Sequence, residues 1–275
     1  MQITADIFGA YLNCPTKSFL RAHNEVGTGN AYADWVRTEN EAYRSAGIKR
    51  LTGGAAPDEC LTGLADTKDL KTAKWRLAVE VVAQTRNLES RIHAVERMPP
   101  EGRGKAAQLI PVRFTFRNKL ARDDKLLITF DALVLSETLG RSVKIGKLIH
   151  GDDHATLKVK TQSLRSRVGK LSEQLAALLT ADIPPDLMLN RHCGECEFRT
   201  WCRQKAVESV KNRSFIPPPT TIIERGKVAV FIKEKVWDRT EGRGKRSATH
   251  SSPAAMARIS GFLTKADGVT RPVMM

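Results

Sequence analysis

Three of the five cysteines in this 275-residue chain fall within ten residues, and this spacing constrains the fold more than any other feature. Cys193 and Cys196 form a Cys-x2-Cys turn around Gly194, and Cys202 follows after five further residues. Thiolates on such a turn can converge on one ion, whereas a disulfide across two residues is strained and usually redox-active. Three ligands do not close a tetrahedral site. The sequence therefore predicts a metal or cluster site with a fourth ligand from elsewhere in the chain.

Cys14 is the strongest candidate for that fourth ligand. Pro15 can begin a helix at its first turn and leave the preceding thiolate near the helix N-terminus. Cys60, in a Gly-rich loop, is the remaining cysteine, and His192 is an alternative ligand for zinc although it adjoins Cys193. Spacing alone does not separate a structural Zn2+ from an iron-sulfur cluster, because both need deprotonated thiolates. Either group would pin the C-terminal segment to the first helices.

Hydrophobic periodicity predicts an α+β fold, in which helices are followed by strands and then by a helix packed on the sheet. The expected helices are one capped by Thr4, then residues 15–22, 32–43 (ended by Gly47), 66–84 and 162–179. The expected strands are residues 88–96, 110–116, 125–135 and 143–150. The last two strands, joined by a turn at 136–141, are expected to form a hairpin.

The charge of the chain points to a polyanionic partner, because a basic surface releases counterions when it neutralises phosphates. The formal net charge is +15, and residues 209–275 carry +8 of it, with 13 Lys and Arg against 5 Asp and Glu. The sequence shows no signal segment and no apolar run long enough to span a bilayer. These two observations predict a cytoplasmic protein without a membrane partner. In that reducing compartment, cysteines favour metal ligation over disulfides.

The cysteine arrangement resembles that of the RecB-like nuclease family, relatives of the CRISPR-associated RecB-type exonucleases in the PD-(D/E)xK superfamily. Four segments carry the resemblance: residues 10–17, 124–135, 146–151 and 184–206. It implies a restriction-endonuclease-like core, a mixed sheet flanked by helices, clasped by a 4Fe-4S cluster on Cys14, Cys193, Cys196 and Cys202. The expected domains are a nuclease domain over residues 1–208 and a basic, disordered tail over 209–275.

Asp131 is the candidate catalytic metal ligand. An isolated carboxylate among apolar neighbours is costly unless it is paired or holds a cation, and the resemblance implies that it binds the Mg2+ or Mn2+ that activates water. The next predicted strand, 143–150, departs from the family pattern because it contains no carboxylate. On this strand, Lys147 is the candidate for orienting the attacking water or a phosphate, and His150 is a candidate substitute ligand or base. Glu96 and His93, on the strand 88–96, are further candidates.

These features lead to three hypotheses. The first is a metal-dependent deoxyribonuclease, a hydrolase acting on phosphodiester bonds with a structural 4Fe-4S cluster. The alternative is a catalytically degenerate DNA-binding module that assists a helicase or another DNA-processing protein. The third is a zinc-stabilised interaction protein without a nucleic-acid role, which the basic charge disfavours. A groove that tracks phosphates would use the basic residues near the core: Arg113, Arg117, Lys119, Arg122, Lys158, Lys160, Arg165 and Arg167.

Overall fold

The computed structural model describes residues 2–62, 75–100, 102–103, 107–188 and 190–211. The chain divides into two compact units, Met1–Ile216 and Pro217–Met275, and every described residue lies in the first. Helix α7 continues past residue 208, where the sequence predicted a domain boundary, to Lys211. The rest of the predicted tail lies outside the described residues.

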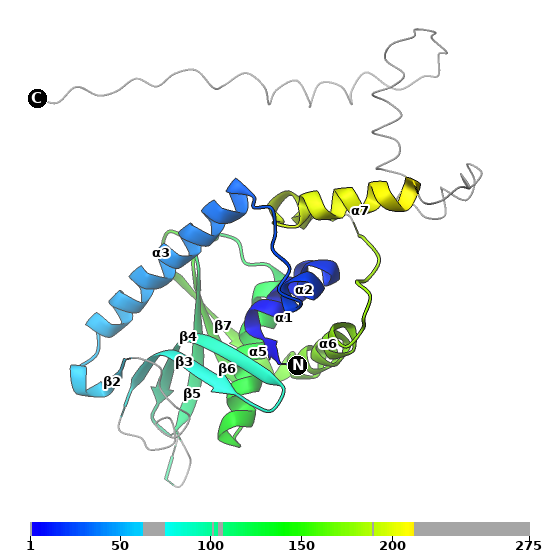
Figure 1. Cartoon of the computed structure of the whole chain (residues 1–275). Helices are drawn as coiled ribbons and strands as arrows, with labels where there is room; N and C mark the ends of the chain where they lie inside the picture. The colour runs from blue at the N-terminus through cyan, green and yellow to red at the C-terminus, as the bar shows by residue number, and fades with distance from the viewer. Residues whose placement is uncertain (1, 63–74, 101, 104–106, 189, 212–275) are drawn as a thin grey trace, which may run out of the picture. The chain divides into compact units, whose positions relative to one another are not determined.

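Along the described part of this unit, one short strand and three helices come first, then most of the strands with one helix before the last two, and then two further helices (Figure 1). The helices are α1 (Ala5–Asn13), α2 (Pro15–Ala22), α3 (Ala31–Gly53), α5 (Arg122–Leu139), α6 (Arg165–Leu179) and α7 (Arg199–Lys211), with short 3-10 turns η1 (Pro57–Glu59), η2 (Thr161–Ser163) and η3 (Arg191–Glu195). The strands are β1 (Ile3–Thr4), β2 (Cys60–Leu61), β3 (Leu77–Gln84), β4 (Leu88–Met98), β5 (Gln108–Thr115), β6 (Ile145–His150) and β7 (Ala155–Lys160).

The described strands form one mixed sheet in the order β2-β3-β4-β5-β6-β7, with β1 beside β4. Strands β3, β4 and β5 are consecutive and antiparallel. Helix α5 then carries the chain across the sheet, so β6 runs parallel to β5, and β7 returns antiparallel to β6. The structure therefore has the α+β architecture that the sequence predicted, a mixed sheet flanked by helices.

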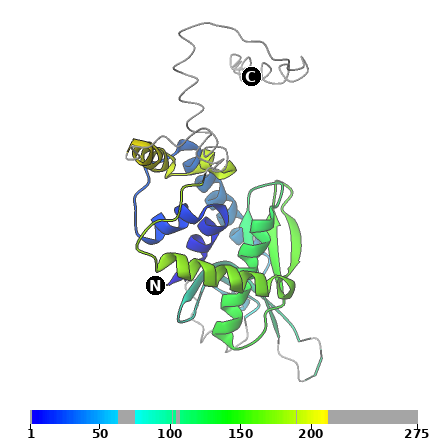
Figure 2. The same ribbon diagram turned by 90° about the vertical axis from the view of Figure 1, so that its right-hand side faces the viewer.

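Helices cover both faces of this sheet. Helix α5 packs on β3 to β6, and α1 and α6 pack in turn on α5, with the Phe8 and Phe130 rings stacked 4.5 Å apart. Helix α3 lies on the opposite face, where Tyr43, Ile48 and Leu51 contact the sheet. Figure 1 shows α3 and α6 on opposite sides, and α6 faces the viewer in Figure 2.

Residues 122–139 form helix α5, so the predicted strand over 125–135 and its hairpin with 143–150 are wrong. Ten of the eighteen residues of α5 are buried, including every one from Ile128 to Ser136. Because the helix lies between the sheet and two other helices, its sequence shows no one-sided apolar stripe and reads like a buried strand. Gly140, with φ of 66°, ends the helix in the left-handed conformation that glycine favours.

The predicted helix over 66–84 is also wrong where the structure describes it, because Leu77–Gln84 is strand β3. Residues 66–74 of that prediction lie outside the described residues. Glu80 has φ of 54° within the strand, and the neighbours Val79 and Val81 belong to the cores on opposite faces of the sheet. This kink interrupts the two-residue alternation that identifies strands.

Helix α3 continues through Gly47, so the prediction that this glycine ends it is wrong. A Cβ atom at Gly47 would lie 2.4 Å from the Phe114 ring. Glycine therefore allows the helix to approach the sheet closely. The other assignments are confirmed: Thr4 caps α1, residues 15–22 are α2, and β4, β5, β6 and α6 lie where the sequence predicted them.

Candidate functional site

Cys14 lies at the junction of α1 and α2, as the sequence predicted. Its backbone is extended, with φ of −164° and ψ of 122°, and Pro15 occupies the first turn of α2. The Cys14 N–H donates to the Ala10 carbonyl oxygen at 2.8 Å, and its carbonyl oxygen accepts from the Ser18 N–H at 3.1 Å. Both neighbouring helices therefore fix the backbone that carries this thiol.

The other three thiols come from one C-terminal segment. Cys193 lies in η3, Cys196 directly follows it, and Cys202 lies in the first turn of α7. The Cys196 N–H donates to the Cys193 carbonyl oxygen at 3.4 Å, which closes the Cys-x2-Cys turn. Asn190 caps η3 and also donates from its side chain to the Asn13 carbonyl oxygen at 3.1 Å. This bond ties the turn to the residue before Cys14.

An ion pair and an apolar contact strengthen this connection. Glu197 pairs with Lys17 at 2.9 Å and with Arg21 at 2.6 Å, both on α2. Burial alone would raise the pKa of the Glu197 carboxyl, but the hydrogen bond from Lys17 and the charge of Arg21 lower it below its usual range. A small core of Phe19, Leu20, Cys196 and Phe198 lies beneath. The C-terminal segment is therefore docked on the first two helices.

We call Cys14, Cys193, Cys196 and Cys202 the cysteine clasp, because they lie close enough for their charges to act on one another. Burial raises the pKa of Cys202 to about 12, and the charges of Cys196, Cys14 and Cys193 add to this rise. Burial also raises the pKa of Cys196. Among the described residues, no group of three or more His, Cys, Asp or Glu is already arranged to hold a metal ion. The thiols are therefore neighbours without forming a ready chelate.

The two alternative ligands lie elsewhere. Cys60 is in β2 and packs with the core under α3. The His192 ring lines a pocket, and its Nε2 atom accepts a hydrogen bond from the Arg191 Nε atom at 3.2 Å. All four residues that the resemblance assigned to a cluster thus gather in one place, and neither alternative joins them.

Asp131 is fully buried on α5 in an ion pair with Arg113 from β5. The Arg113 Nε and Nη2 atoms each donate to one carboxylate oxygen at 2.8 Å, and the Ser90 hydroxyl donates to Oδ1 at 2.5 Å. Burial would lower the pKa of Arg113, but Asp131 raises it above its ordinary value, so the guanidinium stays charged. We call Ser90, Arg113 and Asp131 the charge centre. Arg113 is therefore an internal partner and not the groove residue that the sequence predicted.

Lys147 lies on the other face of the sheet. A Cβ atom at the preceding residue, Gly146, would meet Ile128 of α5, and successive side chains of a strand point to opposite faces. Lys147 forms an ion pair with Glu96 of β4, and both side chains are about four-fifths buried, with exposures of 18% and 20%. The structure therefore separates Asp131 from Lys147 instead of joining them in one centre.

Among the described residues, the two histidine candidates have hydrogen-bond surroundings that differ from those of Asp131. His93 Nδ1 accepts a hydrogen bond from the Phe114 N–H at 3.0 Å, so its side chain replaces a backbone partner between β4 and β5. Burial, then the charges of Arg113 and Arg44, hold the pKa of His93 well below 6.5, which keeps the ring neutral. His150 ends β6 opposite Thr115, and its buried Nδ1 atom has no hydrogen-bond partner among the described residues.

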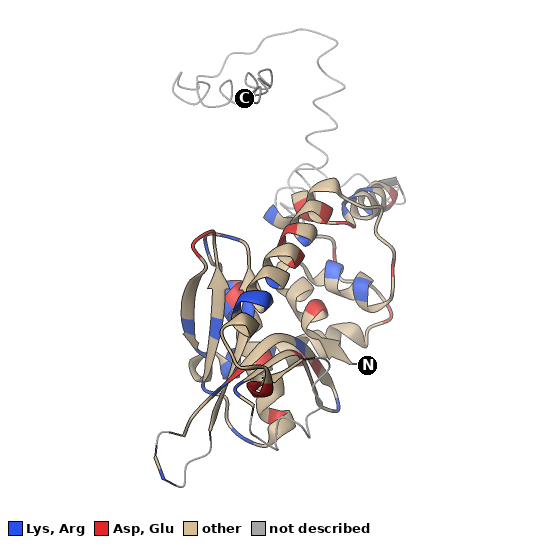
Figure 3. Ribbon diagram, turned by 90° about the vertical axis from the view of Figure 1, so that its left-hand side faces the viewer, with Lys and Arg blue, Asp and Glu red and all other residues tan. Residues whose placement is uncertain are grey.

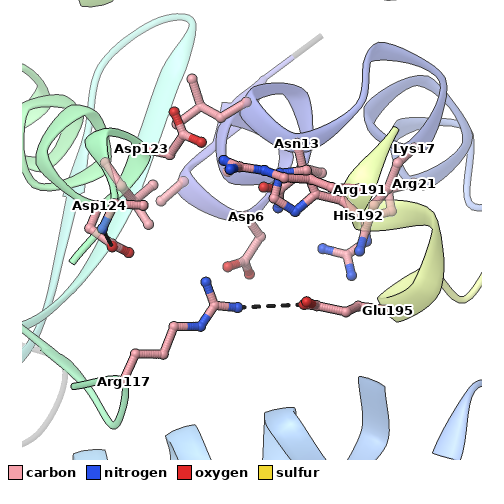
Figure 4. Close-up of a pocket in the computed structure, with 16 residues that line it drawn as sticks. Asp6, Asn13, Lys17, Arg21, Arg117, Asp123, Asp124, Arg191, His192 and Glu195 are labelled. Carbon is pink, nitrogen blue, oxygen red and sulfur yellow. Dashed lines mark hydrogen bonds and ion pairs between the residues drawn. The ribbon is translucent and has the colours of Figure 1, made fainter. Parts of the chain in front are cut away.

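A pocket of about 550 Å3 lies between α1, α2, η3 and the start of α5. Figure 4 shows Asp123 and Asp124 on one side and Lys17, Arg21 and Arg191 on the other, with Asp6 between them. The rim carries an ion pair between Arg117 and Glu195 at 3.6 Å. Sequence reasoning missed this pocket because its walls come from segments far apart in the chain, and no local pattern links them.

Comparisons with known proteins add little to this geometry. No protein-family model matches the chain, and a search of curated proteins finds no significant match. One solved structure, described as "Crystal structure of SSO0001", matches at 14% identity with a TM-score of 0.30. The match spans 50% of this chain and 66% of that one, slightly less than two thirds of its length. Within the described residues, every helix is too short or too polar to cross a membrane.

Proposed function

We propose that this chain is a DNA-binding protein related to the RecB-like nucleases, in which the cleavage centre is degenerate and the cysteine clasp holds a structural 4Fe-4S cluster. One observation carries the proposal. Each carboxylate that the sequence predicted for catalysis forms an ion pair within the chain, Asp131 with Arg113 and Glu96 with Lys147. The mixed sheet flanked by helices supports the PD-(D/E)xK core that the resemblance implies.

A divalent ion binds carboxylate oxygens whose lone pairs are open to it. At Asp131, the two oxygens already accept three hydrogen bonds, two of them from a charged guanidinium. An incoming ion would have to displace Arg113 and leave that cation buried without its partner, which costs several kcal/mol. The charge centre therefore favours a structural role for Asp131 over the catalytic role that the sequence predicted.

Binding to DNA is supported by charge. The net charge of +15 favours a polyanion, and Arg117 and Arg191 stand exposed at the pocket rim and wall. Lys17 and Arg21, also at the pocket, both pair with the more buried Glu197. We expect the contacts to fall on phosphates, which fix position without reading sequence. A helicase or another DNA-processing protein is then the partner that would use the bound strand.

The cysteine clasp fits an iron-sulfur cluster in its donor chemistry. Four thiols from two distant segments lie near one another, and burial, then the charges of the other three, raise the pKa of Cys202. A bound cationic centre would reverse that effect, because coordinated thiolates are deprotonated outright. The group would supply a cross-link between the C-terminal segment and the first helices. Structural Zn2+ on the same thiols is the alternative.

The test is one preparation assayed in two ways. Full-length protein, purified without oxygen, is mixed with end-labelled DNA and either Mg2+ or Mn2+. We expect the logarithm of the binding constant to fall linearly with the logarithm of the salt concentration. We also expect the DNA to remain uncleaved. Protein that binds no DNA at low salt would overturn the proposal.

Metal-dependent hydrolysis is the second candidate, and one observation favours it. Glu96 and Lys147 place an acid and a lysine side by side on one face of the sheet, where a bound ion could replace the lysine. If the assay shows cleavage, Glu96→Gln and Lys147→Met test this pair, and Asp131→Asn tests the charge centre. Loss of cleavage with the first two variants and not with the third would place the metal at Glu96.

A further inference from the structure

Three aromatic side chains form a row at the start of helix α3. The Tyr32 and Trp35 rings stack with centroids 5.6 Å apart and planes at 29°, and the Phe116 ring meets Trp35 edge-on at 5.8 Å. Tyr32 is 51% exposed and Trp35 is 49% exposed. We call these three residues the aromatic row. It presents two large rings to solvent next to a third that is half-buried.

The aromatic row takes no part in the core. Tyr32 and Trp35 are three residues apart and so share one face of α3, but the contacts of α3 with the sheet begin further along, at Tyr43 and Gly47. None of the apolar clusters among the described residues includes a member of the row. Folding therefore does not explain why these rings are aromatic.

The surroundings of the row are polar and partly cationic. Asn30 caps α3 and donates from its side chain to the Gly194 carbonyl oxygen of η3 at 2.8 Å. Phe116 immediately precedes Arg117, whose guanidinium reaches Glu195 of η3 at 3.6 Å. The row thus lies beside the rim of the pocket in Figure 4, and Arg117 joins the two.

Arg117 is available to an anion. Its side chain is 45% exposed and that of Glu195 is 38% exposed, and exposed ion pairs of this kind contribute about 0–1 kcal/mol. A phosphate can therefore replace the Glu195 carboxylate at little cost. Helix α3 itself carries both acids and bases (Figure 3), and Arg37 pairs with Asp34 and Arg44 with Glu41. Arg117 directly follows Phe116 in the chain and is partly exposed, so it is a cation beside the row that a phosphate can reach.

We infer that the aromatic row is a stacking platform for single-stranded nucleic acid, with bases on Tyr32 and Trp35 and a phosphate on Arg117. The inference rests on the proposed function and narrows its substrate class. Exposed rings beside a cation are what a single strand needs, because every base has a π-face and every linkage a charge. In a duplex the bases stack on one another, so no base face is free to stack on the Tyr32 and Trp35 rings.

The test uses the full-length chain and three labelled probes: an oligothymidylate of about 20 nucleotides, an abasic strand of equal length, and a duplex of equal length. The abasic strand keeps the phosphates and removes the bases. Trp35→Leu keeps an apolar side chain and removes the π-face, whereas Trp35→Phe keeps a ring. Ile183→Ala, at a side chain that is 77% exposed, is the control for trimming an exposed apolar group.

We expect wild-type protein to bind the oligothymidylate more tightly than the abasic strand. Trp35→Leu should weaken oligothymidylate binding by roughly 5- to 150-fold, the range for losing one stacked base. It should leave abasic and duplex binding unchanged. Trp35→Phe should retain most of the affinity, and Ile183→Ala all of it.

Three results would overturn the inference. If wild-type protein binds the duplex, but Trp35→Leu and wild-type protein bind the oligothymidylate with equal affinity, the row is not a stacking platform. The proposed function then stands. If wild-type protein binds none of the probes, the proposed function fails with it. If Trp35→Leu changes only the mass of the protein in light scattering, the row is a contact between copies of this chain.

Discussion

The cysteine clasp and the charge centre hold acidic groups in opposite ways. In the charge centre, a buried carboxylate has its cation and its hydrogen bonds supplied by the chain. In the clasp, four thiols lie near one another, and the pKa of Cys202 rises to about 12 because burial and the neighbouring thiolates both oppose its ionisation. The comparison teaches where an added cation would help. It would relieve repulsion in the clasp, whereas in the charge centre it would compete with Arg113.

The largest effect should come from breaking the clasp. We predict that Cys202→Ala in anaerobically purified protein removes the brown colour and the bound iron and lowers the melting temperature. Binding energy at such sites is also folding energy, on the order of 10 kcal/mol for structural zinc in small domains. Absorption, metal analysis and thermal melts measure the three outcomes.

Cys60→Ala is the matched control, because Cys60 is another half-buried cysteine but lies in β2, away from the clasp. It should keep colour and iron. Colourless wild-type protein with stoichiometric zinc would replace the cluster with the structural zinc site. Equal metal loss in both variants would show that the clasp does not hold the metal.

The second effect concerns the charge centre. We predict that Arg113→Met lowers the free energy of unfolding by about 3–5 kcal/mol, because it leaves the Asp131 carboxylate buried without its cation. The double variant Arg113→Met with Asp131→Leu should recover most of this loss, since apolar groups can replace a buried ion pair. Urea unfolding measures both. Arg91→Met, at a side chain that is 80% exposed, should cost little.

Mn2+ sharpens this test. If Asp131 is a metal ligand that Arg113 merely blocks, Mn2+ should stabilise Arg113→Met more than it stabilises Arg91→Met. We expect equal responses, because a lone carboxylate and the Ser90 hydroxyl provide too few ligands. A stabilisation specific to Arg113→Met would return Asp131 to the catalytic role that the sequence predicted.

A smaller effect separates the metal-free clasp from the loaded one by pH. In metal-free protein, the folded state raises the pKa of Cys202 from 9.0 to about 12, so the unfolded chain loses this proton first. The stabilisation is complete below about pH 9 and is lost as the pH rises toward 12. We predict that the stability of the metal-free protein falls over this window, and that Cys202→Ala reduces the slope. Unfolding of metal-free samples across the window measures it.

Loaded protein should show the opposite trend near neutral pH. Metal binding needs thiolates, so it strengthens as the pH rises and protons leave the ligands. Metal-free and loaded samples with the same pH dependence would mean that the clasp thiols do not bind the group.

The two regions also differ in how far the sequence predicts them. The clasp follows from spacing, because Cys193, Cys196 and Cys202 lie in one segment and Pro15 marks the junction that carries Cys14. The charge centre depends on β4, β5 and α5 meeting in space, which no local pattern records. The Asp131 prediction rested on a strand register, and the true element is a helix that is buried on nearly every side.

Signals for that helix were nonetheless present. Asp123 and Asp124 stand in its first turn, and Gly140 follows its last residue, as helix ends favour. In contrast, α2 and α6 were predictable because each has one apolar face and an exposed one. Strand β3 lacked such a signal, because the kink at Glu80 breaks its alternation.

The smallest predicted effect lies at the rim, where Arg117 and Glu195 join the end of β5 to the η3 turn that carries Cys193. Glu195→Gln should change the free energy of unfolding by less than about 0.5 kcal/mol, because exposed ion pairs contribute little. It should instead free Arg117 and strengthen oligonucleotide binding by a few-fold at low salt. Glu137→Gln, an exposed acid on α5, makes the same change in net charge elsewhere. If both variants bind DNA equally well, the gain in affinity reflects total charge alone. Arg117 would then not be a specific phosphate contact beside the aromatic row.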